Sequence, residues 1–251
     1  MVILVYKEKV VVAIIAAAGS GKRMGAAVNK IWLPLAGKPV LEHTLETFQH
    51  SLIVDRIVLV VNPAESERFQ GFLSEKSRGW RIPVNITAGG AERQDSVFNG
   101  LRFVTGELGI EPSRALVVIH DGARALITSE QLERAVAAAY TYQAAGIGVP
   151  VKDTIKQVDA DGWIRHTPDR SSLWAIQTPQ TFDLELLCRC YREVAGGGRL
   201  FSDDCGVVEA CGYPVKMVMG SYENLKITTP EDLAMAEAIL RRREDAGRAR
   251  V

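Results

Sequence analysis

The chain has 251 residues, enough for one large domain or two small ones. Its 30 basic and 30 acidic residues cancel, so the composition indicates neither a nucleic-acid-binding surface nor an acidic tail. No apolar run reaches the roughly 18 residues that a membrane-spanning helix needs. We therefore expect no nucleic-acid partner and no membrane partner, and any site for an anionic ligand must come from a local group of cations.

The four cysteines all lie in the last third of the chain, at Cys188, Cys190, Cys205 and Cys211. None of them forms a Cys-x-x-Cys pair, and the four histidines do not cluster near them, which argues against a structural zinc site. Free thiols in a reducing compartment are the simpler interpretation. On this ground we expect a cytoplasmic protein.

The first long apolar run, Val10–Ala18, ends in a glycine-rich loop that carries Lys22 and Arg23. An apolar run of this length predicts a buried parallel strand. A secretory signal is the alternative, but cleavage after Ala18 would remove the strand that carries the loop. Glycines let backbone N–H groups turn toward an anion, and the two cations add positive charge. The loop therefore predicts a polyphosphate site at the C-terminal end of the first strand.

The spacing of this loop does not match the two commonest phosphate-binding patterns. A P-loop would need glycine at Ala16 and a hydroxyl residue at Arg23, and a dinucleotide fingerprint would need glycine at Met24. The loop is similar instead to the nucleotidyltransferase signature Ala-Ala-Gly-x-Gly-x-Arg-Met, followed by a lysine that Lys30 supplies. A plain surface turn after a core strand is the alternative.

Further along the chain, segments of strand length alternate with segments of helical period. Strands are predicted at Val10–Ala17, Arg56–Val61, Pro83–Thr87, Ala115–His120, Gly146–Val151 and Pro214–Met219. Helices are predicted at Val40–His50, Arg93–Val104 and Ser129–Gln143, and from Pro230 onward. The alternation predicts an α/β fold with a doubly wound, mostly parallel sheet. In such sheets ligands bind beyond the C-terminal ends of the strands.

Residues 152–178 break this alternation. Two short alternating stretches, Thr154–Val158 and Trp163–Thr167, flank the turn Asp159–Gly162, which is the pattern of a β-hairpin. An isolated two-stranded hairpin is marginal in water, so it must pack on the body or embrace a second copy of the chain. We predict one domain over residues 1–251 with a protruding β-hairpin arm at about 152–178, and a homodimer.

Two groups of residues follow predicted strands at the expected ligand edge. Asp121 is a candidate magnesium ligand, with a turn or N-cap role as the alternative, and Arg124 can bind a phosphate bidentately. Gly89 and Gly90 precede the helix that carries Ser96, and their backbone can approach a flat base.

Lys226 comes just before the last predicted helix. Together with Lys30, from the other end of the chain, it would clamp one phosphate. A solvated surface lysine is the alternative.

Motifs are spread over nearly the whole chain, at residues 17–24, 89–97, 120–124, 152–156, 169–170, 177–182, 202–204 and 224–233. In this order and spacing they resemble the 2-C-methyl-D-erythritol 4-phosphate cytidylyltransferase family, from Ala16 to about Leu240. The resemblance implies a Rossmann-like nucleotidyltransferase fold. It also implies that CTP reacts with a sugar-alcohol phosphate, 2-C-methyl-D-erythritol 4-phosphate, to give a CDP-linked product and pyrophosphate for isoprenoid synthesis.

The resemblance also implies roles for individual residues. The catalytic residues would be Arg23, Lys30 and Lys226, and Asp121 would help to place Mg²⁺. The nucleotide pocket would be formed by Ala17, Ala18, Gly19, Gly21, Gly89, Gly90 and Ser96. The second substrate would be surrounded by Arg124, Thr154, Arg170, Thr178 and Ser202, with Thr154 and Arg170 coming from the partner's arm. Since the attacking phosphate oxygen is already anionic, we expect catalysis by positioning and charge neutralisation.

The sequence departs from the usual family pattern at Asn29 and Ile31, which flank the catalytic lysine, and at Gly122, Ala125 and Ser202. Two other functions stay open. A ribitol 5-phosphate cytidylyltransferase is the nearest alternative, although its loop typically has Leu-Ala-Gly-Gly at residues 16–19. A nucleotide-binding protein without catalytic activity is the second, and it would bind CTP without releasing pyrophosphate.

Overall fold

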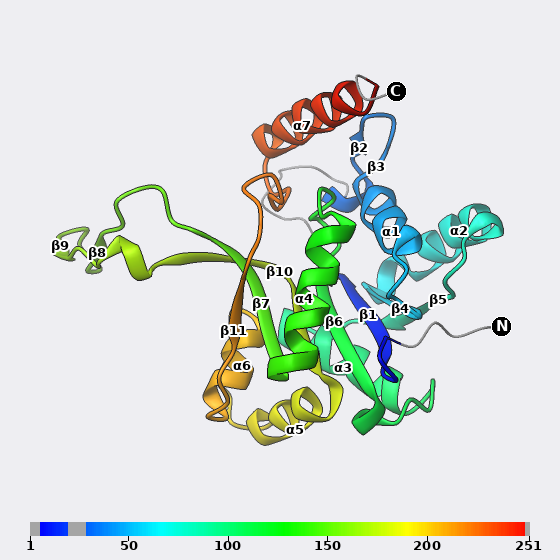
Figure 1. Ribbon diagram of the computed structural model, residues 1–251, viewed down its shortest axis with the longest axis horizontal. Helices are drawn as coiled ribbons and strands as arrows, with labels where there is room; N and C mark the ends of the chain where they lie inside the picture. The colour runs from blue at the N-terminus through cyan, green and yellow to red at the C-terminus, as the bar shows by residue number, and fades with distance from the viewer. Residues whose placement is uncertain (1–5, 20–28, 249–251) are drawn as a thin grey trace.

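The computed structural model describes residues 6–19 and 29–248. Its centre is a seven-stranded sheet in the order β11-β7-β10-β6-β1-β4-β5, with helices on both faces (Figure 1). The strands are β1 (Val10–Ala17), β4 (Arg56–Val61), β5 (Val84–Ala88), β6 (Ala115–Asp121), β7 (Ala144–Pro150), β10 (Trp174–Asp183) and β11 (Lys216–Met219). The α-helices are α1 (Val40–His50), α2 (Ser66–Lys76), α3 (Arg93–Thr105), α4 (Ser129–Tyr142), α5 (Leu184–Val194), α6 (Asp204–Ala210) and α7 (Pro230–Arg248).

The prediction of an α/β fold with a mostly parallel sheet is confirmed. β1 pairs in parallel with β4 on one side and with β6 on the other, and β4 with β5 and β7 with β11 are parallel as well. The exception is β10, which runs antiparallel to both β6 and β7. The sequence did not predict this strand, because four of its buried residues are polar: Gln177, Thr178, Gln180 and Thr181.

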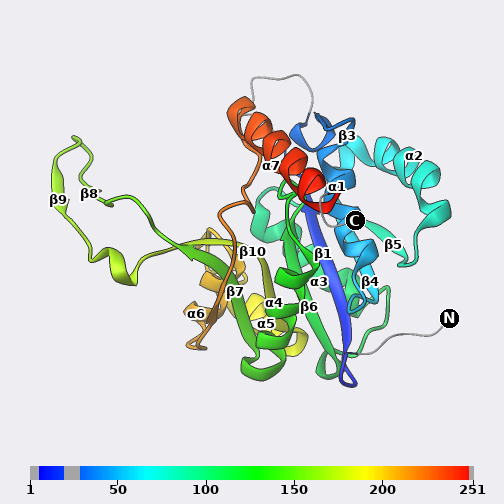
Figure 2. The ribbon, with the colours of Figure 1, turned by 45° about the horizontal axis from the view of Figure 1, so that its top comes forward.

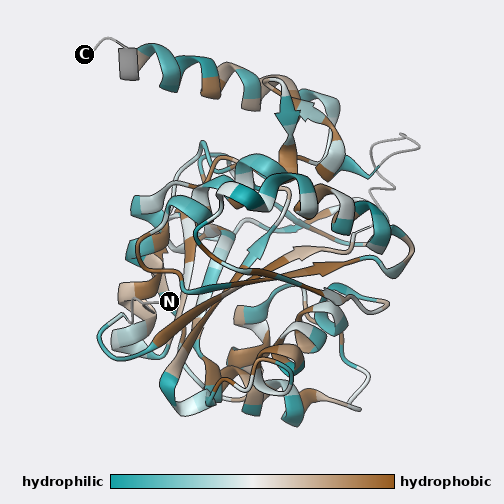
Figure 3. Ribbon diagram, turned by 90° about the vertical axis from the view of Figure 1, so that its right-hand side faces the viewer, coloured by the Kyte–Doolittle hydropathy of each residue, from teal (hydrophilic) through white to brown (hydrophobic). Residues whose placement is uncertain are grey.

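The core has one layer on each face of the sheet, as the alternation of side chains along β1 requires. Val11, Ala13 and Ile15 face a cluster that contains residues of α1, α2 and α4. Val12 and Ile14 face a second cluster with α3, α5 and α6. Figure 3 shows the hydrophobic strands between more hydrophilic outer surfaces. The described helices include none that is long and apolar enough to cross a membrane.

A third, smaller apolar cluster joins α7 to segments near the strand ends. It combines Ala236 of α7 with Leu35 of β2 (Pro34–Leu35) and Leu126 of the loop after β6. β2 pairs with β3 (Lys38–Pro39) just before α1. This packing holds α7 near the C-terminal ends of the strands, where the predicted ligand-binding residues lie.

Residues 151–173 leave the body of the molecule between β7 and β10 (Figures 1 and 2). They include the two-stranded antiparallel pair β8 (Gln157–Val158) and β9 (Ile164–His166). The turn lies at Asp159–Gly162 as predicted, but the strands are shorter than the sequence predicts, because regular pairing is confined to β8 and β9 and is interrupted by an irregularity between Gln157 and Val158. We call these residues, 151–173, the arm segment, and Trp174–Thr178 belong to β10 of the central sheet.

Candidate active site

A cavity of about 660 Å³ opens at the C-terminal ends of β1 and β6. It is lined by Ala16, Ala17, Ala18, Gly19, Asn29, Lys30, Ile31, Asn62, Pro63, Gly90, Ala91, Glu92, Arg93, Ser96, Asp121, Ala123, Lys226 and Thr228. We call it the central cavity. Eight of the predicted site residues therefore share one space: Ala17, Ala18, Gly19, Lys30, Gly90, Ser96, Asp121 and Lys226. Gly21 and Arg23 lie outside the described residues.

The Gly89-Gly90 turn comes into close contact with the end of β1. A Cβ atom on Gly89 would lie 2.5 Å from the Cβ of Ala18, and one on Gly90 would lie 2.3 Å from the Cβ of Asp95. Any larger residue would push the turn away from the cavity. Ser96 fixes the turn from α3, since its Oγ accepts a hydrogen bond from the Gly90 N–H at 3.1 Å. This wall of the cavity is therefore backbone, suited to a flat ligand.

Asp121 ends β6 and lies among three cations. Its Oδ2 is 2.7 Å from the Nζ of Lys226 and 3.8 Å from the Nε of Arg124, and its Oδ1 is 3.4 Å from the Nε of Arg93. Burial alone would raise the pKa of this carboxyl. The charges of Lys226, Arg93 and Arg124 outweigh burial and hold the pKa of Asp121 well below its usual range. Asp121 is therefore an anion at any working pH.

Buried hydrogen bonds support Asp121 from behind. The Asp121 N–H donates to the Thr178 hydroxyl at 3.0 Å, and this hydroxyl lies 3.1 Å from Nδ1 of His120. The other ring nitrogen of His120, Nε2, lies 3.2 Å from the carbonyl oxygen of Arg124. Burial lowers the pKa of His120 to about 4, so the ring is neutral. Because a carbonyl oxygen can only accept, Nε2 carries the ring proton and donates to the Arg124 carbonyl.

Lys226 is placed by the segment between β11 and α7. The Ile227 N–H donates to the Ala123 carbonyl at 2.9 Å. The side chain of Asn224, which is fully buried, donates to the Thr178 carbonyl at 2.9 Å. The Asn224 carbonyl in turn accepts from Arg124 at 2.7 Å. The loop after β6 thus holds Lys226 from two sides.

Lys30 begins the short 3₁₀ helix η2 (Lys30–Trp32), and Glu65 anchors its surroundings. The two carboxylate oxygens of Glu65 accept from the Asn29 amide at 2.9 Å and from the Trp32 indole at 3.1 Å. Asn29, which departs from the usual family pattern, therefore has a structural partner here. Local sequence carries no signal for Glu65, because it lies 33 residues or more from both donors.

The residues predicted for the second substrate are not among the described residues that line the central cavity. Arg124 and Thr178 lie behind Asp121, in the contacts described above. Arg170, on the arm segment, donates to the Lys152 carbonyl at 2.6 Å, and Thr154 lies on the same segment. Ser202 directly precedes Asp203, the N-cap of α6.

Arg93 is a cavity residue that the sequence analysis did not single out. It is the first residue of α3 and contacts both Asp121 and Asp204. The available signal was its place after the Gly-Gly turn, where a helix begins at the ligand edge. Its carboxylate partners could not be identified from spacing, because Asp204 is 111 residues away.

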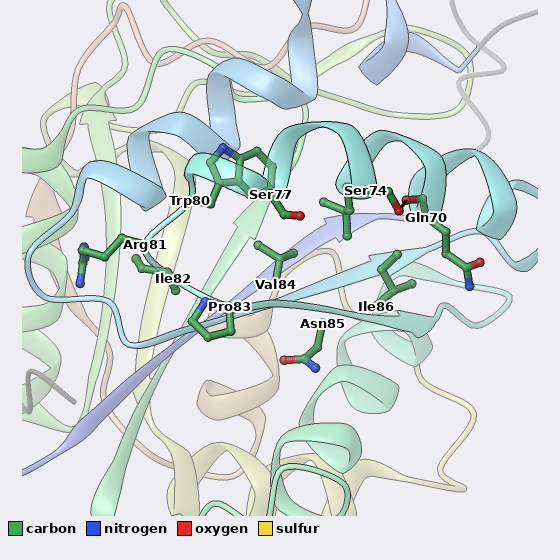
Figure 4. Close-up of a pocket in the computed structure, with 11 residues that line it drawn as sticks. Gln70, Ser74, Ser77, Trp80, Arg81, Ile82, Pro83, Val84, Asn85 and Ile86 are labelled. Carbon is green, nitrogen blue, oxygen red and sulfur yellow. Dashed lines mark hydrogen bonds between the residues drawn. The ribbon is translucent and has the colours of Figure 1, made fainter. Parts of the chain in front are cut away.

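A second cavity, of about 600 Å³, lies between α2 and the edge strand β5 (Figure 4). Figure 4 shows Val84 and Ile86 of β5 pointing toward the helix. Among its described lining residues, Arg81 carries the charge, and Arg81 bonds the Ser51 carbonyl. This groove lacks the group of cations that a polyphosphate needs, so the central cavity is the better candidate.

The described residues contain no group of three or more histidine, cysteine or acidic side chains that could hold a metal by themselves. Asp121 offers one ionised carboxylate to the central cavity. Mg²⁺ commonly takes one or two carboxylates and shares the rest of its shell with phosphates and water. The side chains therefore fit an ion that is held jointly with a bound polyphosphate, and they do not fit a dedicated protein cage.

Comparisons with known proteins agree on one family. A family model described as 2-C-methyl-D-erythritol 4-phosphate cytidylyltransferase matches residues 11–242. A protein of that name from Caldanaerobacter subterraneus subsp. tengcongensis is 47% identical over 230 residues, which cover 92% of this chain and 98% of that protein. Another, from Geobacillus kaustophilus, is 48% identical over 229 residues, covering 91% and 96%.

Solved structures give the same result. A 4-diphosphocytidyl-2C-methyl-D-erythritol synthase from Anaerococcus prevotii superposes with a TM-score of 0.79 at 31% identity, covering 93% of this chain and 99% of that one. A 2-C-methyl-D-erythritol 4-phosphate cytidylyltransferase from Thermus thermophilus superposes with a TM-score of 0.71 at 31% identity, with the same coverage.

Proposed function

The chain belongs to the 2-C-methyl-D-erythritol 4-phosphate cytidylyltransferase family, and on this premise we propose that it transfers the cytidylyl group of CTP to 2-C-methyl-D-erythritol 4-phosphate. The products are 4-diphosphocytidyl-2-C-methyl-D-erythritol and pyrophosphate, in isoprenoid precursor synthesis. The observation that carries the proposal is the central cavity, where a backbone wall for a base meets Lys30, Asp121 and Lys226. The family match favours this substrate over ribitol 5-phosphate.

The reaction needs charge neutralisation more than proton transfer. A phosphate oxygen of the sugar-alcohol phosphate forms a bond to the α-phosphorus of CTP, and the bond to the bridging oxygen breaks as pyrophosphate leaves. Because the nucleophile is already an anion, no general base is required. Lys30 and Lys226, which line the same cavity, supply positive charge around the α-phosphate. Arg23 and Gly21 complete the triphosphate site in this proposal.

We propose Mg²⁺ as the cofactor, held by the Asp121 carboxylate together with phosphate oxygens of CTP. When bound, the ion supplies charge neutralisation at the triphosphate. The contribution of the chain is an ionised carboxylate whose position is fixed by Lys226 and by the hydrogen bond from its own N–H to Thr178.

We further propose a homodimer formed through the arm segment. Trp163 is 73% exposed and Ile164 is 61% exposed, and large apolar side chains gathered on a protruding segment favour a protein contact. A second copy would cover these side chains and bring Thr154 and Arg170 to the other chain's central cavity. The cytoplasm is the proposed location, supported by the four free cysteines.

A pyrophosphate-release assay tests the function directly. The purified protein is incubated with CTP and Mg²⁺, and with either 2-C-methyl-D-erythritol 4-phosphate or ribitol 5-phosphate. We expect release with the methylerythritol phosphate at a kcat/KM far above that with ribitol phosphate. Release with ribitol phosphate alone would replace the substrate. CTP binding by calorimetry without release from either compound would make the chain a nucleotide-binding protein without this activity.

A further inference from the structure

Arg93 contacts two carboxylates of different character. Its Nε lies 3.4 Å from Asp121, which faces the central cavity. Its Nη2 lies 2.7 Å from Asp204, which is fully buried at the start of α6. Burial alone would lower the pKa of Arg93, but the two carboxylates raise it above its usual value, so the guanidinium is always charged. Arg93 thus connects the cavity wall with the interior beneath it.

Asp204 is held on its other side by Tyr191 of α5. The Tyr191 hydroxyl donates to Oδ1 of Asp204 at 2.6 Å. Burial, together with the Asp204 charge, raises the pKa of Tyr191 well above its usual value, so this hydroxyl keeps its proton. The Tyr191 ring also stacks on Phe98 of α3, with ring centres 5.8 Å apart and an interplanar angle of 7°. α3 and α5 are therefore aligned around the same carboxylate.

The backbone at Asp204 is fixed as well. The side-chain oxygen of Gln180 accepts from the N–H groups of Asp204 at 2.9 Å and of Cys205 at 3.1 Å. The amide nitrogen of Gln180 donates to Asp203 at 2.8 Å. These bonds fix the backbone that carries Asp204, and the Tyr191 hydroxyl and Arg93 hold the carboxylate itself. Burying the Asp204 charge costs desolvation energy, which an apolar side chain of similar volume would avoid. The charge therefore points to a role beyond packing.

We propose that Asp204 and Tyr191 are positioning residues, which hold the Arg93 guanidinium beneath Asp121 and so keep Asp121 paired with Lys226. Arg93 and Lys226 compete for one carboxylate, that of Asp121. With Asp204 in place, the charge of Arg93 is shared between two anions, and Oδ2 of Asp121 stays with Lys226 at 2.7 Å. Without the Asp204 charge, Asp121 becomes the sole anionic partner of Arg93 and is drawn away from Lys226.

Asp204 and Tyr191 would thus affect the active site although they are not among the residues that line the central cavity. Asp204 and Tyr191 are 0% and 2% exposed, and neither can reach a ligand there. Their effect must pass through Arg93. The proposal rests on the proposed cytidylyl transfer for its activity readout, and its test is designed to separate the two.

The test is a double-mutant cycle between Arg93 and Asp204, measured as kcat for pyrophosphate release and as CTP affinity by calorimetry. Asp204→Asn should lower kcat roughly tenfold, in line with the loss of one charged hydrogen bond. In the Arg93→Gln background the same substitution should leave kcat unchanged, because Asp204 acts only through Arg93. The double variant should also unfold at a higher temperature than Arg93→Gln alone, because the single variant leaves the buried Asp204 charge without a cation.

Tyr191→Phe is the milder variant, and it keeps the stack on Phe98. Tyr191→Phe should lower kcat a few-fold in the native protein. In the Asp204→Asn background it should leave kcat unchanged. Tyr142→Phe, on an exposed tyrosine of α4, is the matched control and should leave kcat and CTP affinity as they are.

Equal, additive losses of kcat in both backgrounds would overturn the proposal, as would full activity of Asp204→Asn. If Arg93→Gln does not fold, Arg93→Lys, which keeps the charge and loses the guanidinium contacts to both carboxylates, takes its place in the cycle with Asp204→Asn. A native protein that binds CTP but releases no pyrophosphate would instead refute the proposed function, and the proposal with it.

Discussion

The central cavity and the arm segment differ in how their side chains are partnered. In the cavity, Asp121 contacts Lys226, Arg93 and Arg124, all within the same chain. On the arm segment, the side chain of Trp163 is 73% exposed, so most of its surface contacts no other described residue. In the described part of one chain, Lys30, Asp121 and Lys226 of the proposed nucleotide site already share one cavity. The arm segment instead leaves large apolar side chains exposed, and this difference supports the proposal that a second chain covers them.

The largest expected effect lies in the cavity. Lys226→Ala removes the cation that pairs with Asp121 at 2.7 Å, and kcat should fall about 100- to 1,000-fold, as for the loss of one preorganised charge-stabilising group. The measurement is pyrophosphate release under saturating CTP. Lys216→Ala, on the exposed edge strand β11, is the control of equal charge and should retain its kcat. Activity of Lys226→Ala within twofold of the native protein would remove Lys226 from the site.

The hydrogen bonds behind Asp121 should make stability depend on pH. The pKa of His120 is lowered to about 4 in the folded state, below the unfolded value near 6.5. As the pH falls, the unfolded state binds the proton first, so stability is lost between pH 6.5 and 4. The expected loss from pH 7 to pH 5 is about 2 kcal/mol.

Urea unfolding at a series of pH values measures this loss. His120→Asn should be less stable at pH 7 but should lose less stability on acidification. His50→Asn, at an exposed position, is the control and should keep the native pH dependence. The same acid dependence in the native protein and in His120→Asn would show that His120 is not the group responsible.

In the arm segment, Trp163→Asp should weaken self-association at least about tenfold, as for the loss of an aromatic anchor in an interface. Sedimentation velocity over a range of protein concentrations measures the change. Leu52→Asp alters a side chain of similar exposure, 69%, outside the arm segment, and should leave association unchanged. A native protein that is monomeric at every concentration would contradict the dimer.

The smallest effect is expected at the ion pairs that connect α7 to the Lys226 segment. Glu223 contacts both Arg242 and Arg243 on the partly exposed side of this helix. Such pairs contribute at most about 1 kcal/mol, a factor of about five, so Glu223→Gln should lower kcat by less than about fivefold. Thermal unfolding and steady-state kinetics together check this, with Glu237→Gln as the control in α7. A loss of tenfold or more would mean that α7 controls Lys226 directly.

Much of the sheet could be predicted because its strands are buried on both faces and read as continuous apolar runs. The bounds of β1 and β4 agree with the sequence prediction residue for residue. β10 was not predicted because its buried residues include amide and hydroxyl side chains. One of them is Gln180, whose side-chain oxygen accepts from the Asp204 N–H. α2 was not predicted because Phe69 is its one buried residue, too weak a pattern to indicate a helix.

In the candidate site, too, residues in local motifs could be predicted and their distant partners could not. Lys30, Asp121 and Lys226 stand in motifs, so local sequence could indicate them, and the structure places all three in one cavity. The partners that hold them are far away in the chain. Asp204 pairs with Arg93 across 111 residues, and nothing in the spacing marks that contact.

A subunit-complementation experiment tests most directly the claim that the site is divided between one chain's cavity and another chain's arm. Lys226→Ala and Arg170→Ala are purified separately, each with little activity, then mixed under conditions that exchange subunits. Half of the dimers then carry both variants, and one of their two sites combines an intact Lys226 with an intact Arg170. We expect recovery to about a quarter of native pyrophosphate release. No recovery, with mixed dimers confirmed by native mass spectrometry, would contradict it.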